Sequence, residues 1–435
     1  MRAVLTNVGS TGDIQPFLAL AAELRRHGHQ PVLAASPTFA PRAERLGIEF
    51  AAVGPEMKME YAHQVMQAML AETDPAKQLR IVLDVTLPPG TTTYQELRDA
   101  CRGADVVIGG ITQPAAQMVQ ETTGIPFVSV QLVHIAMPTT YRRPLGLPLP
   151  PLPGKLGPLT NRALSQLFAR HIRRVCGPVV NRYRAEQGLP ALKDPLFGGS
   201  SQLTLYAVSR HVARPAPGWP AIRHLAGYFF LDEDEGWQPD PALLDFLADG
   251  PPPVVISFGS MMPADSEQLT HLVLEAVRHA GCRAIIQEGW AGLATGDLPA
   301  NVRSVGFVPH SWLFPRAAAV IQHGGAGTSA AAFRAGIPSV FVPHMADQPV
   351  WAAIARELGV SGPPVPFARL TAERLGQAII ATVTNPDYAR AAAALGAAIR
   401  SEDGVGTARL MIERLVESRS APSARGATGR SNSST

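Results

Sequence analysis

Short apolar runs, glycine-containing turns and amphipathic helix patterns follow one another repeatedly along this sequence. Near its start, the apolar run 3–6 leads through the turn 9–13 into helical apolar spacing over 17–24. In the second half, the run 319–322 leads through the turn 323–328 into a helix predicted over 329–335. Apolar runs of this length that alternate with helices are typical of buried parallel strands in βαβ units. The sequence therefore predicts an α/β fold with parallel sheets.

The chain has 435 residues, which is enough for two or three domains. A segment rich in proline, glycine and acids over 214–240 separates two halves, and the α/β pattern restarts at 253–260. We expect two Rossmann-like, doubly wound domains that face each other across a cleft. The expected boundaries are 1–230 for the first domain, 231–250 for the interdomain linker, 251–417 for the second domain and 418–435 for a disordered tail.

Charge and composition exclude several classes of protein. The formal net charge is only +3 and charged residues make up 17% of the chain, so no basic surface for nucleic acid is expected. The three cysteines are far apart and form no zinc or disulfide pattern. No apolar stretch is long enough to span a bilayer, and the basic and apolar helix pattern over 162–174 allows at most peripheral membrane contact. We therefore expect a cytoplasmic protein.

The turn in the second half has the residue types of a diphosphate site. Its glycines let an anion approach the backbone where the next helix offers unpaired N–H groups. The ring N–H and hydroxyl donors beside them add further contacts. These residues are His323, Gly324, Gly325, Gly327 and Thr328. They also suit an ordinary strand-to-helix turn with a structural histidine, and both interpretations stay open at this point.

The turn in the first half places a carboxylate where the chain enters a helix. Asp13 there is either a general base that faces the cleft or an N-cap for the first helical N–H groups. Its spacing alone favours the cap.

Four motifs in order resemble the UDP-glycosyltransferase family, and in particular its sterol glucosyltransferases and its bacterial macrolide and glycopeptide glycosyltransferases. The motifs are Gly-Ser-Thr-Gly-Asp-Ile-Gln-Pro (9–16), Gly-Phe-Val-Pro-His-Ser-Trp-Leu-Phe (306–314), His-Gly-Gly-Ala-Gly-Thr (323–328) and Pro-His-Met-Ala-Asp-Gln-Pro (343–349). The resemblance implies a GT-B fold whose first domain binds the acceptor and whose second binds a nucleotide sugar. It implies transfer of a hexose from a UDP- or dTDP-sugar to an acceptor hydroxyl, with inversion.

The resemblance also implies roles for single residues. Asp13 matches the general base, and His323 matches the donor to the diphosphate, which together with the helix start would stabilise the leaving group without a metal. Asp347 and Gln348 match the pair that hydrogen-bonds the sugar hydroxyls. The other nucleotide-binding candidates are Ser260, Gly324, Gly325, Gly327 and Thr328 at the diphosphate, and Trp290, Phe307 and Val308 at the base.

The acceptor is expected to be a small apolar molecule. The proline- and leucine-rich segment 138–158 is either a flap over the acceptor or a packed irregular loop. Acceptor-binding candidates are Gln131, His134, Met137 and Tyr141. We expect a monomer or homodimer with no cofactor and no metal, and interpret the acidic run 232–234 as a solvated hinge.

Two other functions fit parts of the sequence. A catalytically silent homologue that activates a partner transferase is the main alternative, although this chain keeps Asp13, Asp347 and Gln348. An NAD-dependent oxidoreductase is disfavoured, because no acid closes the strand predicted after the glycine turn.

Overall fold

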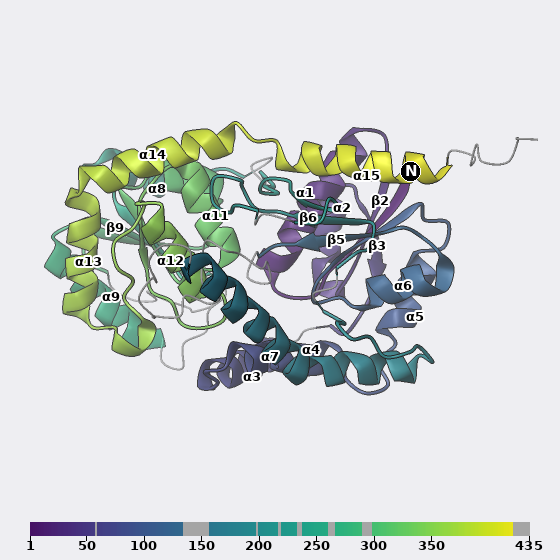
Figure 1. Ribbon diagram of the computed structural model, residues 1–435. Coiled ribbons are helices and arrows are strands. Elements are labelled where there is room, and N and C mark those ends of the chain that lie inside the picture. Colours follow the sequence, from purple (N-terminus) through teal and green to yellow (C-terminus); the bar gives the residue numbers. More distant parts are fainter. Residues whose placement is uncertain are drawn as a thin grey trace, which may run out of the picture.

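The computed structural model describes residues 1–56, 59–133, 156–196, 199–215, 219–232, 237–259, 266–288 and 298–420. This part of the chain forms two α/β units, each with its own parallel sheet (Figure 1). The predicted fold class, two α/β domains with parallel sheets, is confirmed.

The first sheet has the strand order β3-β2-β1-β4-β5-β6-β7, and all its pairs are parallel. Its strands are β1 (Arg2–Thr6), β2 (Gln30–Ala35), β3 (Glu49–Ala52), β4 (Val106–Gly110), β5 (Phe127–Gln131), β6 (Leu203–Tyr206) and β7 (Arg223–Leu225). Its helices are α1 (Thr11–Arg26), α2 (Ala40–Arg45), α3 (Met59–Ala71), α4 (Pro75–Thr86), α5 (Thr93–Ala100), α6 (Ala115–Thr123) and α7 (Leu156–Glu186).

The second sheet has the order β10-β9-β8-β11-β12 and is also parallel throughout. Its strands are β8 (Val254–Ser257), β9 (Ala284–Gln287), β10 (Val302–Val305), β11 (Ala319–Gln322) and β12 (Ser339–Phe341). The first helix of this half, α8 (Pro241–Ala248), lies inside the range 231–250 that is expected for the linker. The helices that follow are α9 (Ser266–Ala280), α10 (His310–Leu313), α11 (Ala326–Ala335), α12 (Gln348–Glu357), α13 (Ala372–Thr384), α14 (Pro386–Arg400) and α15 (Gly404–Ser420).

The central strands are buried on both faces. On β1, Ala3 and Leu5 pack into the core under α1, whereas Val4 packs into the core on the opposite face with α4 to α7. All three side chains have no exposed surface. This two-sided burial explains why the strands read as uninterrupted apolar runs in the sequence.

Strand order reverses beside the first strand of each sheet. β1 lies between β2 and β4, and β8 lies between β9 and β11. Open α/β sheets bind ligands at this switch point, beyond the carboxyl ends of the strands. The turn with Asp13 follows β1 and the turn with His323 follows β11. Both turns singled out in the sequence therefore lie at a switch point.

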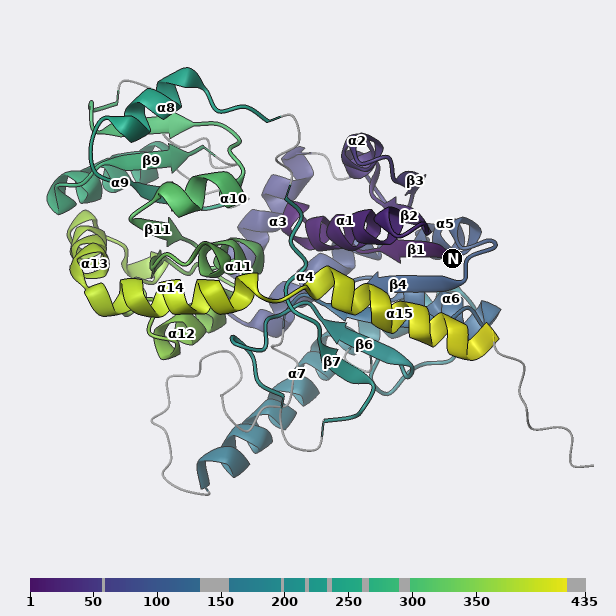
Figure 2. The same cartoon turned by 90° about the horizontal axis from the view of Figure 1, so that it is seen from above.

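The last of the described helices, α15, packs on the first domain. α14 and α15 run end to end along one side of the molecule and cross from the second unit to the first (Figure 2). Ala408 and Ile412 of α15 are fully buried in the core that contains α1, and Arg409 donates to Glu23 of α1 at 3.2 Å. Most of α15 lies within the range 251–417 that is expected for the second domain, whereas the helix packs against the core of the first domain.

The two chain crossings between the units touch each other. A Cβ on Gly404 would overlap the carbonyl oxygen of Tyr228, and one on Gly227 would lie 3.1 Å from the Cα of Gly404. In the linker beside them, Asp232 makes a two-point ion pair with Arg334 of α11, at 2.6 and 2.8 Å. The linker is thus fixed to the second domain at one of the acids of the run 232–234; residues 233–236 lie outside the described residues.

Several boundaries differ from those expected. α7 begins at Leu156, so the last residues of the predicted loop 138–158 are helical, while 138–155 lie outside the described residues. α11 begins at Ala326 rather than at 329, because Gly325 already has the extended backbone of an N-cap. α15 continues to Ser420, beyond the expected start of the tail at 418, and 421–435 are not described. Among the described helices, none is long and apolar enough to cross a membrane.

Candidate functional site

Asp13 is the third residue of α1, and Ser10 is its N-cap. The Ser10 N–H and Oγ both donate to Asp13 Oδ2, at 2.7 and 3.0 Å. The sequence pattern Ser-x-x-Asp is that of a capping box. In this pattern Ser10 is the N-cap and Asp13 is the third helical residue, so Asp13 itself is not the cap. Asp13 Oδ1 accepts no hydrogen bond from the described residues. The carboxylate is therefore anchored through one oxygen and open at the other.

Asp13 depends on a glycine behind it. Gly9 has a φ of +143°, and a Cβ at this position would overlap the Asp13 carboxylate. Burial raises the pKa of Asp13 above its usual value, and the two hydrogen bonds from Ser10 partly oppose that rise. A carboxylate with a raised pKa is a stronger base than one with the usual pKa.

The loop before α1 is held from the other side of the switch point. Thr112, which follows β4, donates its hydroxyl to Val8 O and Asn7 Oδ1, both at 2.9 Å. Asn7 is buried and donates to the backbone carbonyl of Asp13 at 2.9 Å. Sequence reasoning did not find these two positioning residues. The position of Thr112 just beyond a central strand was the available signal.

His323 lies at the end of β11 between two glycines. Its side chain is buried, with 8% of the residue exposed. A Cβ on Gly325 would overlap the ring at Nε2, and one on Gly259 would lie 3.0 Å from Cε1. Gly259 follows β8, so the ring is enclosed by backbone from both sides of the second switch point. Only residues without a side chain leave room for it there.

Burial lowers the pKa of His323 to about 4, with a smaller opposing contribution from the Ser257 backbone. The imidazole is therefore neutral near pH 7, and its Nδ1 is buried without a hydrogen-bond partner in the described structure. A buried nitrogen without a partner next to a helix N-terminus suits a polar ligand.

Buried polar side chains stabilise the turn 323–328 between β11 and α11. Ser329 donates to Gln322 Oε1 and Gln322 donates to Ser339 Oγ, both at 3.1 Å, and all three are buried. Thr328 is also buried, at the start of α11. Gly324 has a φ of +96°, and a Cβ on it would meet the backbone of Gln348 at 3.0 Å. Gly327 faces open space, with nothing within 4 Å of a Cβ. The structure thus brings His323, Gly324, Gly325, Gly327 and Thr328 together at one helix N-terminus.

Asp347 and Gln348 begin α12, which follows β12. Asp347 Oδ2 accepts a hydrogen bond from Trp351 Nε1 at 2.7 Å. Gln348 is buried, and its Oε1 accepts the N–H groups of His344 and Met345, at 2.7 and 3.1 Å. The Gln348 side-chain oxygen is therefore used within the loop that precedes α12. Asp347, in contrast, is partly exposed.

The electrostatic environment of Asp347 includes the charge of Asp13. Burial raises the pKa of Asp347 to about 6, the Trp351 hydrogen bond opposes this, and the charge of Asp13 raises it further. The contribution of Asp13 is the smallest of these effects. A charge of the first domain thus affects the pKa of a carboxylate in the second domain, 334 positions away along the chain.

The candidates for base binding are placed differently from one another. Phe307 is 71% exposed, which is rare for a large apolar side chain. Val308 is buried in the core of the second domain, and its carbonyl accepts from Gln287 Nε2 at 2.8 Å. Gln287 in turn bonds His310, whose ring stacks on Phe314 at 4.2 Å. Ser260 and Trp290 lie outside the described residues.

Of the acceptor-binding candidates, only Gln131 is described. It is buried at the end of β5, and its Nε2 donates to Ser129 Oγ at 2.8 Å. His134, Met137 and Tyr141 lie outside the described residues. Within the described ranges, no group of three or more His, Cys, Asp or Glu side chains could hold a metal ion.

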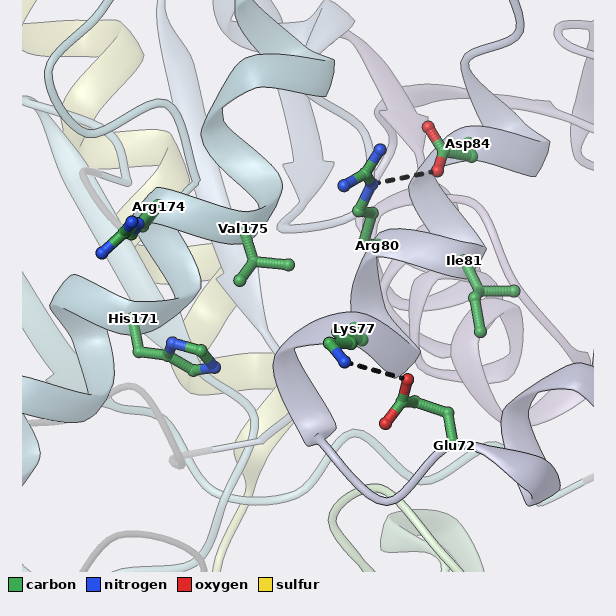
Figure 3. Close-up of a pocket in the computed structure, with 8 residues that line it drawn as sticks. All are labelled: Glu72, Lys77, Arg80, Ile81, Asp84, His171, Arg174 and Val175. Atoms are coloured by element: carbon green, nitrogen blue, oxygen red, sulfur yellow. Dashed lines mark hydrogen bonds and ion pairs between the residues drawn. The ribbon is translucent and has the colours of Figure 1, made fainter.

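A separate pocket of about 580 Å³ lies on the first domain between α4 and α7 (Figure 3). Its lining is mostly charged: Glu72, Lys77, Arg80, Ile81, Asp84, His171, Arg174 and Val175. Lys77 pairs with Glu72 at 3.6 Å and Arg80 pairs with Asp84 at 3.3 Å. None of the predicted site residues is part of this lining.

Comparisons with known proteins identify the family of the chain. Residues 3–129 match the N-terminal domain of glycosyltransferase family 28, and residues 272–404 match the C-terminal domain of proteins like erythromycin biosynthesis protein CIII. The chain is 35% identical to O-mycaminosyltylonolide 6-deoxyallosyltransferase of Streptomyces fradiae over 96% of its own length and 98% of that protein. It is 30% identical to a sterol 3-beta-glucosyltransferase of Arabidopsis thaliana, over 94% of its length and 67% of the relative.

Solved structures share the fold. The glycosyltransferase VinC in complex with dTDP superposes with a TM-score of 0.66 and 21% identity, over 96% of this chain and 100% of that one. The structure described as the glycotransferase of kitacinnamycin gives a TM-score of 0.69 at 21% identity, over 95% and 98% of the two chains. The chain therefore belongs to the UDP-glycosyltransferase family, with a GT-B fold and relatives among natural-product and sterol glycosyltransferases.

Proposed function

We propose that this protein is an inverting glycosyltransferase that moves a hexose from a UDP- or dTDP-sugar to a hydroxyl of a small apolar acceptor in the cytoplasm. One observation carries the proposal: the first-domain switch point presents the Asp13 carboxylate with Oδ1 open, and the second-domain switch point presents His323 at a glycine-rich helix N-terminus. A nucleotide sugar bound between them would have a base on one side of its anomeric carbon and a diphosphate site on the other.

In this mechanism Asp13 is the general base. Oδ2 is held by Ser10, so the free Oδ1 takes the proton from the acceptor hydroxyl as its oxygen attacks the anomeric carbon. The attack comes from the face opposite the nucleotide, and this geometry inverts the configuration. The raised pKa of Asp13 improves the driving force for proton transfer.

The diphosphate leaves toward the start of α11. Negative charge grows on its oxygens as the glycosidic bond breaks, and the unpaired N–H groups of that helix end oppose it. A ring N–H of His323 donates one further hydrogen bond, and Thr328 contributes a hydroxyl. Phe307 offers an exposed aromatic face on which the base can stack.

The relatives support the choice of substrates. One neighbour is described in complex with dTDP, and the named relatives transfer a deoxyhexose or glucose, the latter to a sterol. We infer a macrolide-like or sterol-like acceptor and a donor from either nucleotide class, bound by a monomer or homodimer.

The test is Asp13→Asn, assayed by mass for sugar transfer across a panel of nucleotide sugars and aglycones. Asparagine can still accept the Ser10 hydrogen bond, so the capping box should survive. Loss of a general base lowers turnover by about 10²- to 10⁴-fold, while the affinity for UDP or dTDP should stay nearly unchanged. Retained turnover would remove Asp13 from the mechanism. His323→Ala should weaken nucleotide binding and turnover together.

A further inference from the structure

The loop that carries Asp347 has a backbone conformation that its own sequence does not favour. Ala346 has a φ of +53°, and it is the one non-glycine residue with a positive φ in the described part of the chain. The left-handed region is disfavoured for a residue with a Cβ, and such residues persist where their surroundings hold them. Asp347 is the next residue, so the direction of its carboxylate depends on this conformation.

The contact that holds Ala346 comes from the other domain. The N–H groups of His344 and Met345 are both bound within the loop, by Gln348 Oε1. The N–H of Ala346 instead donates to Oε1 of Gln78 on α4, at 2.9 Å. The third amide of the turn is therefore satisfied across the interface, by a residue 268 positions away.

Gln78 is locked in place by its own domain. It is 3% exposed, and its Nε2 donates to Met69 O and Glu72 O, at 3.0 and 2.7 Å. These two carbonyls can only accept, so the amide nitrogen must face them and the oxygen must face Ala346. The orientation of the group that reaches Ala346 is thus determined by the connection between α3 and α4.

Helix α3, which precedes the connection to α4, packs against the second domain. Met66, Met69 and Leu70 of α3 pack against the core of the second sheet, as does Ala346 itself. Figure 2 shows α3 lying on the side of the first domain that faces the second. Gln78 therefore lies at the inner end of a packed contact between the domains, where water does not replace its hydrogen bond.

We propose that Gln78 is a positioning residue for donor recognition: it holds Ala346 in the left-handed conformation and thereby aims Asp347 at the sugar of the nucleotide sugar. This rests on the proposed function, in which Asp347 binds a sugar hydroxyl. It makes recognition of the sugar depend on the acceptor domain, because the holding group belongs to that domain. Binding of the nucleotide alone does not pass through this contact.

The test compares calorimetric affinities for UDP-glucose and dTDP-glucose with those for UDP and dTDP. In Gln78→Ala we expect the affinity gained from the sugar to fall about tenfold, which corresponds to about 1.4 kcal/mol, while the affinity for the bare nucleotides stays within about twofold. Arg80→Ala, on the exposed side of the same helix, is the matched control and should change neither. An equal loss for nucleotide and nucleotide sugar, or no loss, overturns the proposal.

A second pair of variants separates positioning from general stability. Glycine adopts the left-handed region freely, so Ala346→Gly should keep the sugar contribution and should restore it in the double variant with Gln78→Ala. Ala346→Val should lower it although Gln78 is intact, since a β-branched residue tolerates this conformation poorly. These two variants also serve if Gln78→Ala does not fold. Failure of Ala346→Gly to restore binding overturns the proposal.

The proposed function fails in a different way. A wild-type protein that binds none of the four ligands contradicts the glycosyltransferase function itself. A wild-type protein that binds nucleotides but gains nothing from the sugar contradicts the role given to Asp347, and with it the role of Gln78.

Discussion

Gly325→Ala should displace the His323 ring without changing any polar group. Gly325 has a φ of −64° and a ψ of 148°, which alanine adopts readily, so the backbone itself is not strained. The added Cβ would overlap Nε2 and would lie 3.1 and 3.3 Å from Cε1 and Cδ2 of His323. Carbon atoms in contact prefer about 3.5–4.0 Å, so the ring must move by about 1 Å.

The magnitude follows from that displacement. A hydrogen bond of about 2.9 Å that is stretched by this amount is no longer made. A hydrogen bond to a charged group contributes about 1.5–3 kcal/mol, so affinity for UDP and dTDP should fall by about 10- to 150-fold. Overpacking around the ring should also lower the free energy of unfolding by about 1–3 kcal/mol.

Calorimetric titration with UDP and dTDP measures the first effect, and thermal unfolding without ligand measures the second. Gly327→Ala is the matched control for stability, because its Cβ meets nothing within 4 Å. An alanine there should leave the unfolding midpoint unchanged or slightly higher, since glycine is a poor helix former. Unchanged nucleotide affinity and an unchanged midpoint in Gly325→Ala would refute the placement of His323 in the diphosphate site.

Two further predictions concern the carboxylates. Gly9→Ala should lower turnover strongly while leaving nucleotide affinity intact, because its φ of +143° strains alanine and its Cβ would overlap Asp13; steady-state kinetics beside nucleotide titrations measure this, and normal turnover would contradict the geometry. The sugar-dependent part of nucleotide-sugar binding should weaken as the pH falls through about 6, the pKa of Asp347, because the protonated carboxyl no longer accepts as an ion. The measurement is the affinity for UDP-glucose of the wild type and of Asp347→Asn, from pH 5 to 8. The ratio of the two affinities should fall as the pH falls through about 6. A ratio that does not change with pH would mean that a group other than Asp347 titrates.

Local patterns in the sequence were enough for the parts of the fold that depend on neighbouring residues. Two-sided burial of β1 and β11 produces apolar runs that identify buried strands, and turns after such strands indicate where a ligand binds. The pattern Ser10-x-x-Asp13 contains the capping box in full, so even the partner of the proposed base was readable. His323 and its neighbouring glycines are likewise adjacent in the sequence, so they could be recognised there as one motif.

Contacts between distant segments were not readable in this way. The hydrogen bond from Ala346 to Gln78 joins residues 268 positions apart, and the sequence around either residue gives no indication of its partner. α15 has an apolar face, but an apolar face does not specify which sheet covers it, so its packing on α1 could not be inferred from its place near the end of the chain. The interdomain part of the site therefore required the structure.

The position of α15 also has a consequence for how the molecule assembles. The core under α1 includes Ala408 and Ile412, so this core stays incomplete until α15 has been synthesised. During translation, the first sheet can form early. The apolar surface that Ala408 and Ile412 later cover stays exposed while the whole second domain is made. We expect a chain shortened before α15 to expose that surface and aggregate, and expect the two domains to come together in a single late step, once α15 has been made.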